Sequence, residues 1–229
     1  MNTNDPLIHA LREFDSRVQE LTTALALEAA RRSPVGAPSA PFGRRTQALR
    51  FASARRLWFV APVPAEAFLR AGNRIAIIAA HALRPILAAR ALFGCRDAIR
   101  RCVDRQTRRL LSLSIGPVAF AALQEHARAS TSAQSLPEDL AVDALARAGW
   151  DLMLADGACT HPTLRRTVEL GLELAAGGDI WQNALTFQRT AVSQAGVVIG
   201  GEAATGASGT DEFFSIAGHL FPEFQWLFG

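Results

Sequence analysis

The amino-acid sequence predicts an all-α fold, an irregular multi-helix domain with an N-terminal helical arm. Along most of the 229 residues, apolar side chains recur every three or four positions, which is the spacing of one helix face. Proline, glycine and aspartate stand at the ends of these runs, as is typical of helix starts and stops. Alternation of apolar and polar residues is nowhere sustained over a useful length, so a sheet-based fold is excluded.

The first helix is predicted to begin at Asp5 and Pro6, because aspartate accepts backbone N–H groups and proline suits the first turn. Its apolar stripe consists of Leu7, Leu11, Phe14, Val18, Leu21 and Leu25. The segment 33–43, SPVGAPSAPFG, is rich in proline and glycine and is interpreted as a linker. We therefore divide the chain into an N-terminal amphipathic helix (1–32), this linker and a helical domain (44–229).

The start of the helical domain is predicted to hold a helix that Pro85 ends at Arg84, followed by a shorter helix to Phe93 with Gly94 as its C-cap. The first of these helices carries Phe68, Gly72, Ile75, Ala79 and Leu83.

The next segment, CRDAIRRCVDRQTRRLLSLSIG, combines a helical apolar pattern with many arginines. The side chains expected to face inward are Ile99, Cys102, Val103 and Leu110, and those expected on the other side are Arg101, Arg105, Arg108 and Arg109. Asp97 with Arg101 and Asp104 with Arg108 are predicted i,i+4 ion pairs. Asp104 is also a possible N-cap of a new helix, and the sequence leaves these two alternatives open.

Four further helix starts are read from the remaining sequence. Gly116-Pro117 opens a helix to about residue 129, and the capping box Ser135 to Glu138 opens one through Leu140, Leu145, Ala148 and Leu152. His161-Pro162 begins a helix that Gly177-Gly178 ends. Asp179 is expected to cap another, with Trp181, Leu185, Gln188 and Val192 on one stripe. The glycine-rich segment 196–209 that follows is interpreted as a flexible loop, or at most a short edge strand.

The C-terminal sequence, DEFFSIAGHLFPEFQWLFG, predicts a short helix and an aromatic-rich tail. Its large apolar residues are Phe213, Phe214, Leu220, Phe221, Phe224, Trp226, Leu227 and Phe228. This tail is either docked on the core or an exposed anchor for a partner. We favour docking, because exposed apolar patches of this size are uncommon on monomers.

Charge is strongly segregated along the chain. The formal net charge is only +3, yet residues 44–109 carry 15 arginines against 3 acidic residues, and residues 110–229 carry 5 arginines against 13 acidic residues. Such a chain either pairs its own halves or presents a basic face and an acidic face to different partners.

The motifs of common enzymes and metal sites are missing from the sequence. All 24 basic residues are arginine, which excludes a lysine Schiff base and a P-loop lysine. Gly201 to Ser208 resembles a P-loop only until Ala207, which stands in the lysine position. Asp156, Cys159 and His161 lack the second ligand pair that structural zinc requires. We therefore expect no catalysis, no cofactor and no metal.

The arginine cluster formed by Arg96, Arg100, Arg101, Arg105, Arg108 and Arg109 is the strongest local signal. It is interpreted as a solvated helix face, as a surface for an acidic protein partner, or as a nucleic-acid site. Nucleic acid is the least favoured of the three, because no aromatic side chains are interleaved with the arginines for base stacking.

The sequence also indicates a soluble, cytosolic protein. Its first residues lack the basic start and apolar block of a secretory signal. The most apolar stretch, Ile75 to Phe93, is interrupted by arginine, histidine and proline. Three cysteines without a C-x-x-C motif are consistent with a reducing compartment.

The central block from Ala91 to Ala127 resembles the SctK family of type III secretion systems. Its matching positions are an arginine-flanked Ile/Val–Asp pair and a helix that ends at Ile-Gly, formed by Ile99, Arg100, Arg101, Val103, Asp104, Ile115 and Gly116. The stretches LWFVAPVPAEAFLRAGNRIAIIAAHALRP and LFPEFQWLFG are similar to the Hrp-type branch of that family. The resemblance covers about residues 45–229, and the chain departs from it at the linker and at the loop near residue 200.

This resemblance implies a cytosolic, helical, non-enzymatic adaptor in a virulence-associated sorting platform beneath the inner-membrane base of the secretion apparatus. Such an adaptor links the cytosolic domain of the ring protein SctD to the pod protein SctQ, which holds SctL and the ATPase SctN. It implies protein partners and neither a cofactor nor a small-molecule substrate. We expect one acidic partner to bind Arg100, Arg101, Arg105, Arg108 and Arg109, and the acidic C-terminal half to meet another; the alternative function is an arginine-rich nucleic-acid-binding regulator.

Overall fold

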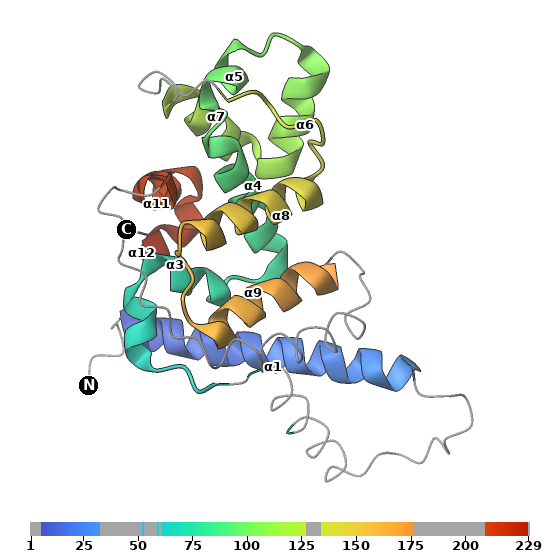
Figure 1. The fold of residues 1–229 in the computed structure, drawn as a ribbon, viewed down its shortest axis with the longest axis vertical. Helices are drawn as coiled ribbons and strands as arrows, with labels where there is room; N and C mark the ends of the chain where they lie inside the picture. Colours follow the sequence, from blue (N-terminus) through green and yellow to red (C-terminus); the bar gives the residue numbers. More distant parts are fainter. Residues whose placement is uncertain are drawn as a thin grey trace.

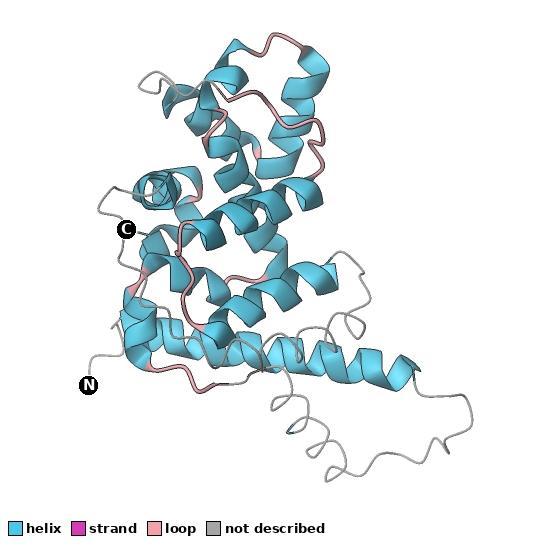
Figure 2. Cartoon of the chain, in the orientation of Figure 1, coloured by secondary structure: helices cyan, strands magenta, loops and turns pink. Residues whose placement is uncertain are grey.

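The computed structural model of the chain describes residues 6–32, 52, 59, 61–126, 134–175 and 209–228. Every regular element in these residues is a helix, which confirms the all-α prediction (Figure 2). In chain order the elements, with η for a short 3-10 helix, are α1 (Pro6–Arg32), η1 (Ala65–Leu69), α3 (Ala71–Arg74), η2 (Ile75–Ile77), α4 (Ala80–Phe93), α5 (Arg96–Arg101), α6 (Arg105–Ile115), α7 (Pro117–His126), α8 (Val142–Ala155), α9 (Pro162–Ala175), α11 (Gly209–Leu220), η4 (Pro222–Phe224) and α12 (Gln225–Phe228).

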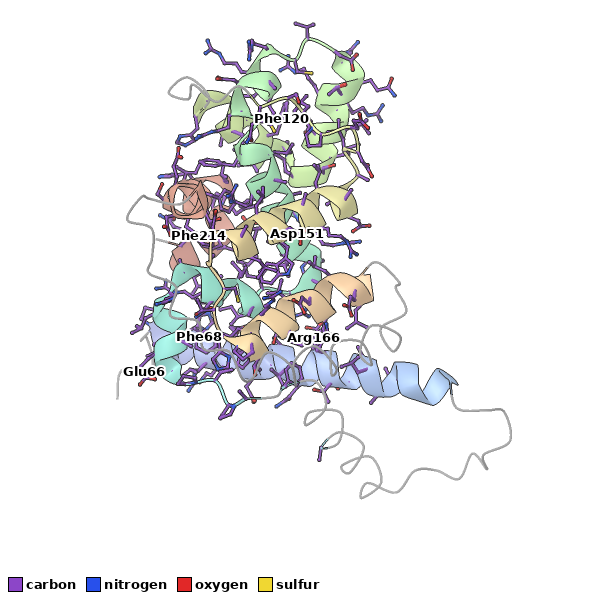
Figure 3. The ribbon with its side chains drawn as sticks, in the orientation of Figure 1. Glu66, Phe68, Phe120, Asp151, Arg166 and Phe214 are labelled. Carbon is purple, nitrogen blue, oxygen red and sulfur yellow. The ribbon has the colours of Figure 1, made fainter. Side chains whose placement is uncertain are left out.

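The helices are stacked in layers from α1 at one end to α5, α6 and α7 at the other (Figure 1). Helix α9 lies next to α1, and α8 forms the next layer. Helix α4 connects these layers to the far lobe, which is formed by α5, α6 and α7. One large apolar core extends through the molecule, from Phe68 near α1 to Phe120 on α7 (Figure 3). The far lobe is therefore joined to the rest of the fold through α4.

Helix α1 begins at Pro6, as predicted, and packs against the domain. Leu21 and Leu25 are buried with Leu170 of α9, and Ala10 joins the main core. The predicted N-terminal arm therefore packs against α9 and against η1 and η2. The linker at 33–43 lies outside the described residues, so the predicted division of the chain stays a prediction.

The prediction that Pro85 ends a helix is wrong. The long predicted helix is replaced by η1, α3 and η2, and the chain is extended at Ile78 and Ala79 before α4 begins. Pro85 is the sixth residue of α4, so its ring removes a single backbone hydrogen bond near the start of the helix. The predicted end at Phe93 with Gly94 as C-cap is confirmed. Within the described part of the chain, no helix has both the length and the apolarity to cross a membrane.

Helices α4 and α8 approach each other more closely than large side chains would allow. Ala88 and Ala89 of α4 and Ala146 and Gly149 of α8 are fully buried or nearly so. A Cβ atom on Gly149 would lie 1.8 Å from the carbonyl oxygen of Leu87. The interface therefore requires glycine at this position, because no real side chain tolerates such a contact.

The predicted capping box at 135–138 is wrong. Residues 134–141 form an irregular segment, and α8 begins at Val142. Asp139 supplies the turn, since its Oδ1 accepts the backbone N–H of Ala141 at 2.8 Å. The start of α9 at Pro162 is confirmed, whereas Gly177-Gly178, the helix predicted from Asp179 and the loop beyond it lie outside the described residues.

The C-terminal tail is docked, as predicted. Its buried side chains are Phe213, Phe214, Leu220, Phe221 and Leu227. Arg74 fixes the end of the tail, because its Nη1 donates to the carbonyl oxygen of Leu227 while Nε and Nη2 donate to carbonyls of η1. Trp226 stays partly exposed and packs on His9 of α1, with 4.3 Å between the ring centroids.

A partly buried ion pair joins α4, the C-cap residue of α8 and the start of α11. Arg90 Nη2 donates to Asp156 Oδ2 at 2.8 Å, and Thr210 donates to the same oxygen from its hydroxyl at 2.5 Å and from its backbone N–H at 2.9 Å. Burial acts to raise the pKa of Asp156, but the hydrogen bonds from Thr210 and Arg90 and the charge of Arg90 outweigh it. The pKa of Asp156 therefore lies below its usual range.

Replacing Gly149 with alanine is expected to lower the free energy of unfolding by about 3 kcal/mol, because the new Cβ forces α4 and α8 apart. Urea unfolding followed by circular dichroism measures the effect. Gly218→Ala in α11 is the matched control, since its Cβ would come no closer than 3.4 Å to another atom. Equal stabilities of the two variants would contradict the close packing described here.

Asp156→Asn is expected to lower the free energy of unfolding by about 2 kcal/mol near neutral pH, because it removes the charge that Arg90 and Thr210 bind. A carboxylate with a lowered pKa stabilises the fold above its unfolded pKa, and this contribution is lost as the pH falls through the folded pKa. The difference between wild type and variant should therefore shrink below about pH 4. Asp151→Asn, at an exposed position on α8 (Figure 3), is the control and should match the stability of the wild type near neutral pH.

Candidate basic interaction surface

The lobe formed by α5, α6 and α7 lies at the end of the molecule opposite α1 (Figure 1). Helix α5 ends at Arg101, and the chain is extended at Cys102 and Asp104 before α6 begins. Leu111 and Ile115 of α6 join Phe120 of α7 in the core. Gly116 connects α6 to α7 with a φ of 87°, a backbone conformation that favours glycine.

Asp104 is the N-cap of α6, which decides between the two alternatives that the sequence leaves open. Its carboxylate accepts the backbone N–H of Thr107 at 2.7 Å and that of Gln106 at 3.4 Å. The Thr107 hydroxyl donates to the same carboxylate at 2.5 Å. These hydrogen bonds, first the one from the Thr107 hydroxyl, hold the pKa of Asp104 below its usual value. Helix α6 therefore starts independently of α5.

Five of the six clustered arginines form an exposed basic surface on α5 and α6. We call these the arginine surface, and they are Arg100, Arg101, Arg105, Arg108 and Arg109. Arg101 donates through Nε to the backbone oxygen of Asp97 at 3.3 Å. Among the described residues, the other four make no hydrogen bond or ion pair through their side chains. Their guanidinium groups are thus available to a partner.

Arg96, the sixth arginine of the cluster, has a structural position instead. It is buried, its guanidinium lies 3.7 Å from the ring centroid of Phe93, and its Nη2 is 3.0 Å from Glu212 Oε1 of α11. Stacking on an aromatic ring and pairing with a carboxylate both stabilise a buried guanidinium. Arg96 therefore attaches α5 to α11 and does not belong to the arginine surface.

The predicted orientation of the apolar residues in this segment is partly wrong. Ile99 is buried as predicted, but Val103 is 93% exposed and Leu110 is 44% exposed. The break between α5 and α6 changes the rotational phase, so Leu111 and Ile115 face the core instead. Leu113 on α6 and Val118 on α7 are also exposed, and sequence reasoning missed both. If Asp104 is taken as the N-cap of a new helix, the sequence predicts this change of phase between α5 and α6.

The predicted ion pairs of this segment are wrong as well. Arg101 donates to the backbone oxygen of Asp97 and not to the Asp97 carboxylate. The carboxylate of Asp104 accepts backbone N–H groups at the start of α6 and does not pair with Arg108. An N-cap carboxylate gains from the positive end of the helix and is aimed away from the residue four positions later. Neither Asp97 nor Asp104 therefore forms an ion pair with Arg101 or Arg108.

The other candidate chemistry of the sequence is dispersed in the fold. Cys159 is buried, and burial raises the pKa of its thiol to about 12. Asp156 is occupied by Arg90 and Thr210. Within the described ranges, no three histidine, cysteine or acidic side chains gather as metal ligands. The segment from Gly201 to Ser208 lies outside those ranges.

Comparison with known proteins identifies the family. A family model described as a bacterial type III secretion protein (HrpB4) matches residues 7–223, nearly the whole chain. No curated protein matches the chain, and no solved structure matches it either. The match extends over the described helices from α1 to α11 and includes the arginine surface. The chain therefore belongs to the HrpB4 family of bacterial type III secretion proteins.

Proposed function

We propose that this protein is a non-enzymatic cytosolic adaptor of the type III secretion sorting platform. In this role it links the inner-membrane ring protein SctD to the pod of SctQ, SctL and the ATPase, and it stays peripherally bound at the inner-membrane base. The arginine surface binds an acidic region of one partner. The acidic C-terminal half of the chain meets the other.

The observation that carries this proposal is the exposure of all five arginines of the arginine surface on one lobe, in a chain of the type III secretion family. Arginine forms bidentate hydrogen bonds with carboxylates and is enriched in protein interfaces. The lobe lies at the opposite end of the molecule from α1 (Figure 1), so a second partner has separate surfaces available to it. This separation supports a bridging role.

The structure does not favour the alternative function, nucleic-acid binding. The sequence of α5 and α6, including the residues between them, contains no aromatic side chain on which a base could stack. Phosphate contacts alone would still give binding that weakens steeply with salt. Nucleic-acid binding is therefore kept as an outcome that the experiment below must detect.

The test is affinity purification of the tagged protein from its native cells under secretion-inducing conditions, with nuclease-treated lysate and mass spectrometry of the co-purifying proteins. We expect SctD and SctQ, with SctL, to co-purify with the wild type. The variant Arg105→Glu/Arg109→Glu should lose one of these partners by about a hundred-fold, because like-charge contacts across an interface cost several kcal/mol. Its unfolding free energy should change by only about 0.5 kcal/mol.

The matched control is Arg12→Glu/Arg70→Glu, which makes the same change in charge at exposed positions far from α6 in the sequence. It should keep the partner that binds the arginine surface. Retention of both partners by the Arg105/Arg109 variant would contradict the assigned surface. Absence of all secretion components, or recovery of protected nucleic acid, would contradict the adaptor function itself.

A further inference from the structure

Helix α6 has an exposed apolar strip in addition to its buried face. Leu111 and Ile115 are at most 2% exposed, whereas Leu110 and Leu113 are 44% and 72% exposed. Residues three apart on a helix are neighbours on its surface, so Leu110 and Leu113 form one continuous strip. A helix needs a single apolar face to pack on its own core, and neither leucine of this second strip belongs to the core that the described residues form.

Exposed apolar side chains are concentrated around this strip. Among the described residues, eight large apolar side chains are exposed, and four of them lie within residues 103–118. Besides the two leucines these are Val103, just before α6, and Val118, at the start of α7. Single exposed apolar residues are common on protein surfaces, but a cluster on one lobe indicates a binding site.

The leucine strip is flanked by arginines. Arg105, Arg109 and Leu113 follow one another at intervals of four residues, so Arg109 lies between Arg105 and Leu113 along one ridge of α6. Helix α6 contains no acidic residue, and the Asp104 carboxylate is bound to the helix start. The face therefore combines an apolar line with an uncompensated positive edge.

Three classes of partner differ in what they would gain from this face. Nucleic acid gains nothing from leucine, and the segment offers no stacking side chain. A lipid surface requires a broad apolar face, but the other face of the 11-residue α6 is buried in the core. A partner helix with apolar residues three or four apart matches a strip of one turn, and acidic residues beside them match the arginines.

We propose that the outer face of α6 docks an acidic amphipathic helix of a protein partner, with Leu110 and Leu113 packed against its apolar stripe and Arg105 and Arg109 paired with its carboxylates. This inference rests on the proposed function, because it specifies the partner of the arginine surface. The docking proposal goes beyond the proposed function, because it makes apolar contact as well as charge a determinant of recognition.

The test uses the full chain and fluorescently labelled designed peptides in anisotropy titrations. One peptide is an acidic helix with glutamates beside a leucine stripe, and the second has the same composition with the stripe scrambled. We expect the stripe peptide to bind about ten-fold or more tightly than the scrambled one. Leu110→Gln/Leu113→Gln should reduce binding of the stripe peptide to the scrambled level, since glutamine keeps helix propensity close to that of leucine.

Leu152→Gln, at a 41% exposed position on α8, is the matched control and should bind like the wild type. Equal binding of the two peptides, or unchanged binding by the Leu110/Leu113 variant, would overturn the inference. Binding of phosphatidylglycerol vesicles in place of either peptide would also overturn it, in favour of a membrane surface, with phosphatidylcholine vesicles as reference.

Purification from native cells separates this inference from the proposed function. Loss of the same partner in the Leu110/Leu113 variant and in the Arg105/Arg109 variant is the supporting result. If only the arginine variant loses its partner, the adaptor function stands and the docked helix is wrong. If the wild type recovers no secretion component, the proposed function fails. The peptide titrations then still decide whether the outer face of α6 binds an acidic amphipathic helix.

Discussion

The close contact of α4 with α8 at Gly149 is the constraint on which the rest of the structure depends. The carbonyl of Leu87 occupies the space that any side chain at position 149 would need. This contact places α8 so that Asp156, at its end, reaches Arg90 of α4 and Thr210 of α11. Since α4 also leads directly into α5, the position of the basic lobe follows from the same interface.

The charge segregation of the chain has two explanations, and each applies to a different part of the basic segment. Along α4 and at the start of α5, arginines pair with acids of the C-terminal half, in the pairs Arg84–Asp143, Arg90–Asp156 and Arg96–Glu212. In the rest of α5 and in α6, no arginine forms an ion pair with another described residue, and the arginine surface is exposed. The halves of the chain therefore neutralise each other at these three contacts, and among the described residues 96–109 the remaining arginines are exposed on α5 and α6.

Much of the fold follows from local signals in the sequence. The start of α1 at Pro6, the start of α9 at Pro162 and the docking of the apolar tail were predictable. Both helices begin with a proline, which suits the first turn, and exposing the aromatic tail would be costly. The errors at Pro85 and at the 135–138 capping box have another cause. Pro85 is the sixth residue of α4, where proline removes a single backbone hydrogen bond and the helix continues, and α8 begins at Val142, after the predicted box. One sequence does not reveal the contact of these two helices at Gly149. The arginine surface was predictable from charge, whereas the exposure of Leu110 and Leu113 depends on Asp104 being an N-cap, an alternative that the sequence left open.

The exposure of those leucines depends on where α6 begins. An α-helix turns by about 100° per residue. In an uninterrupted helix from α5 to α6, Val103, Leu110 and Leu113 would therefore share the face of Ile99 and be buried. The Asp104 cap starts a new helix instead, which turns Leu111 and Ile115 to the core. The segment contains two apolar stripes, Leu110 with Leu113 and Leu111 with Ile115, and the position of the N-cap leaves the first exposed to solvent beside the arginines. The proposed docking face is thus a consequence of a single capped helix start.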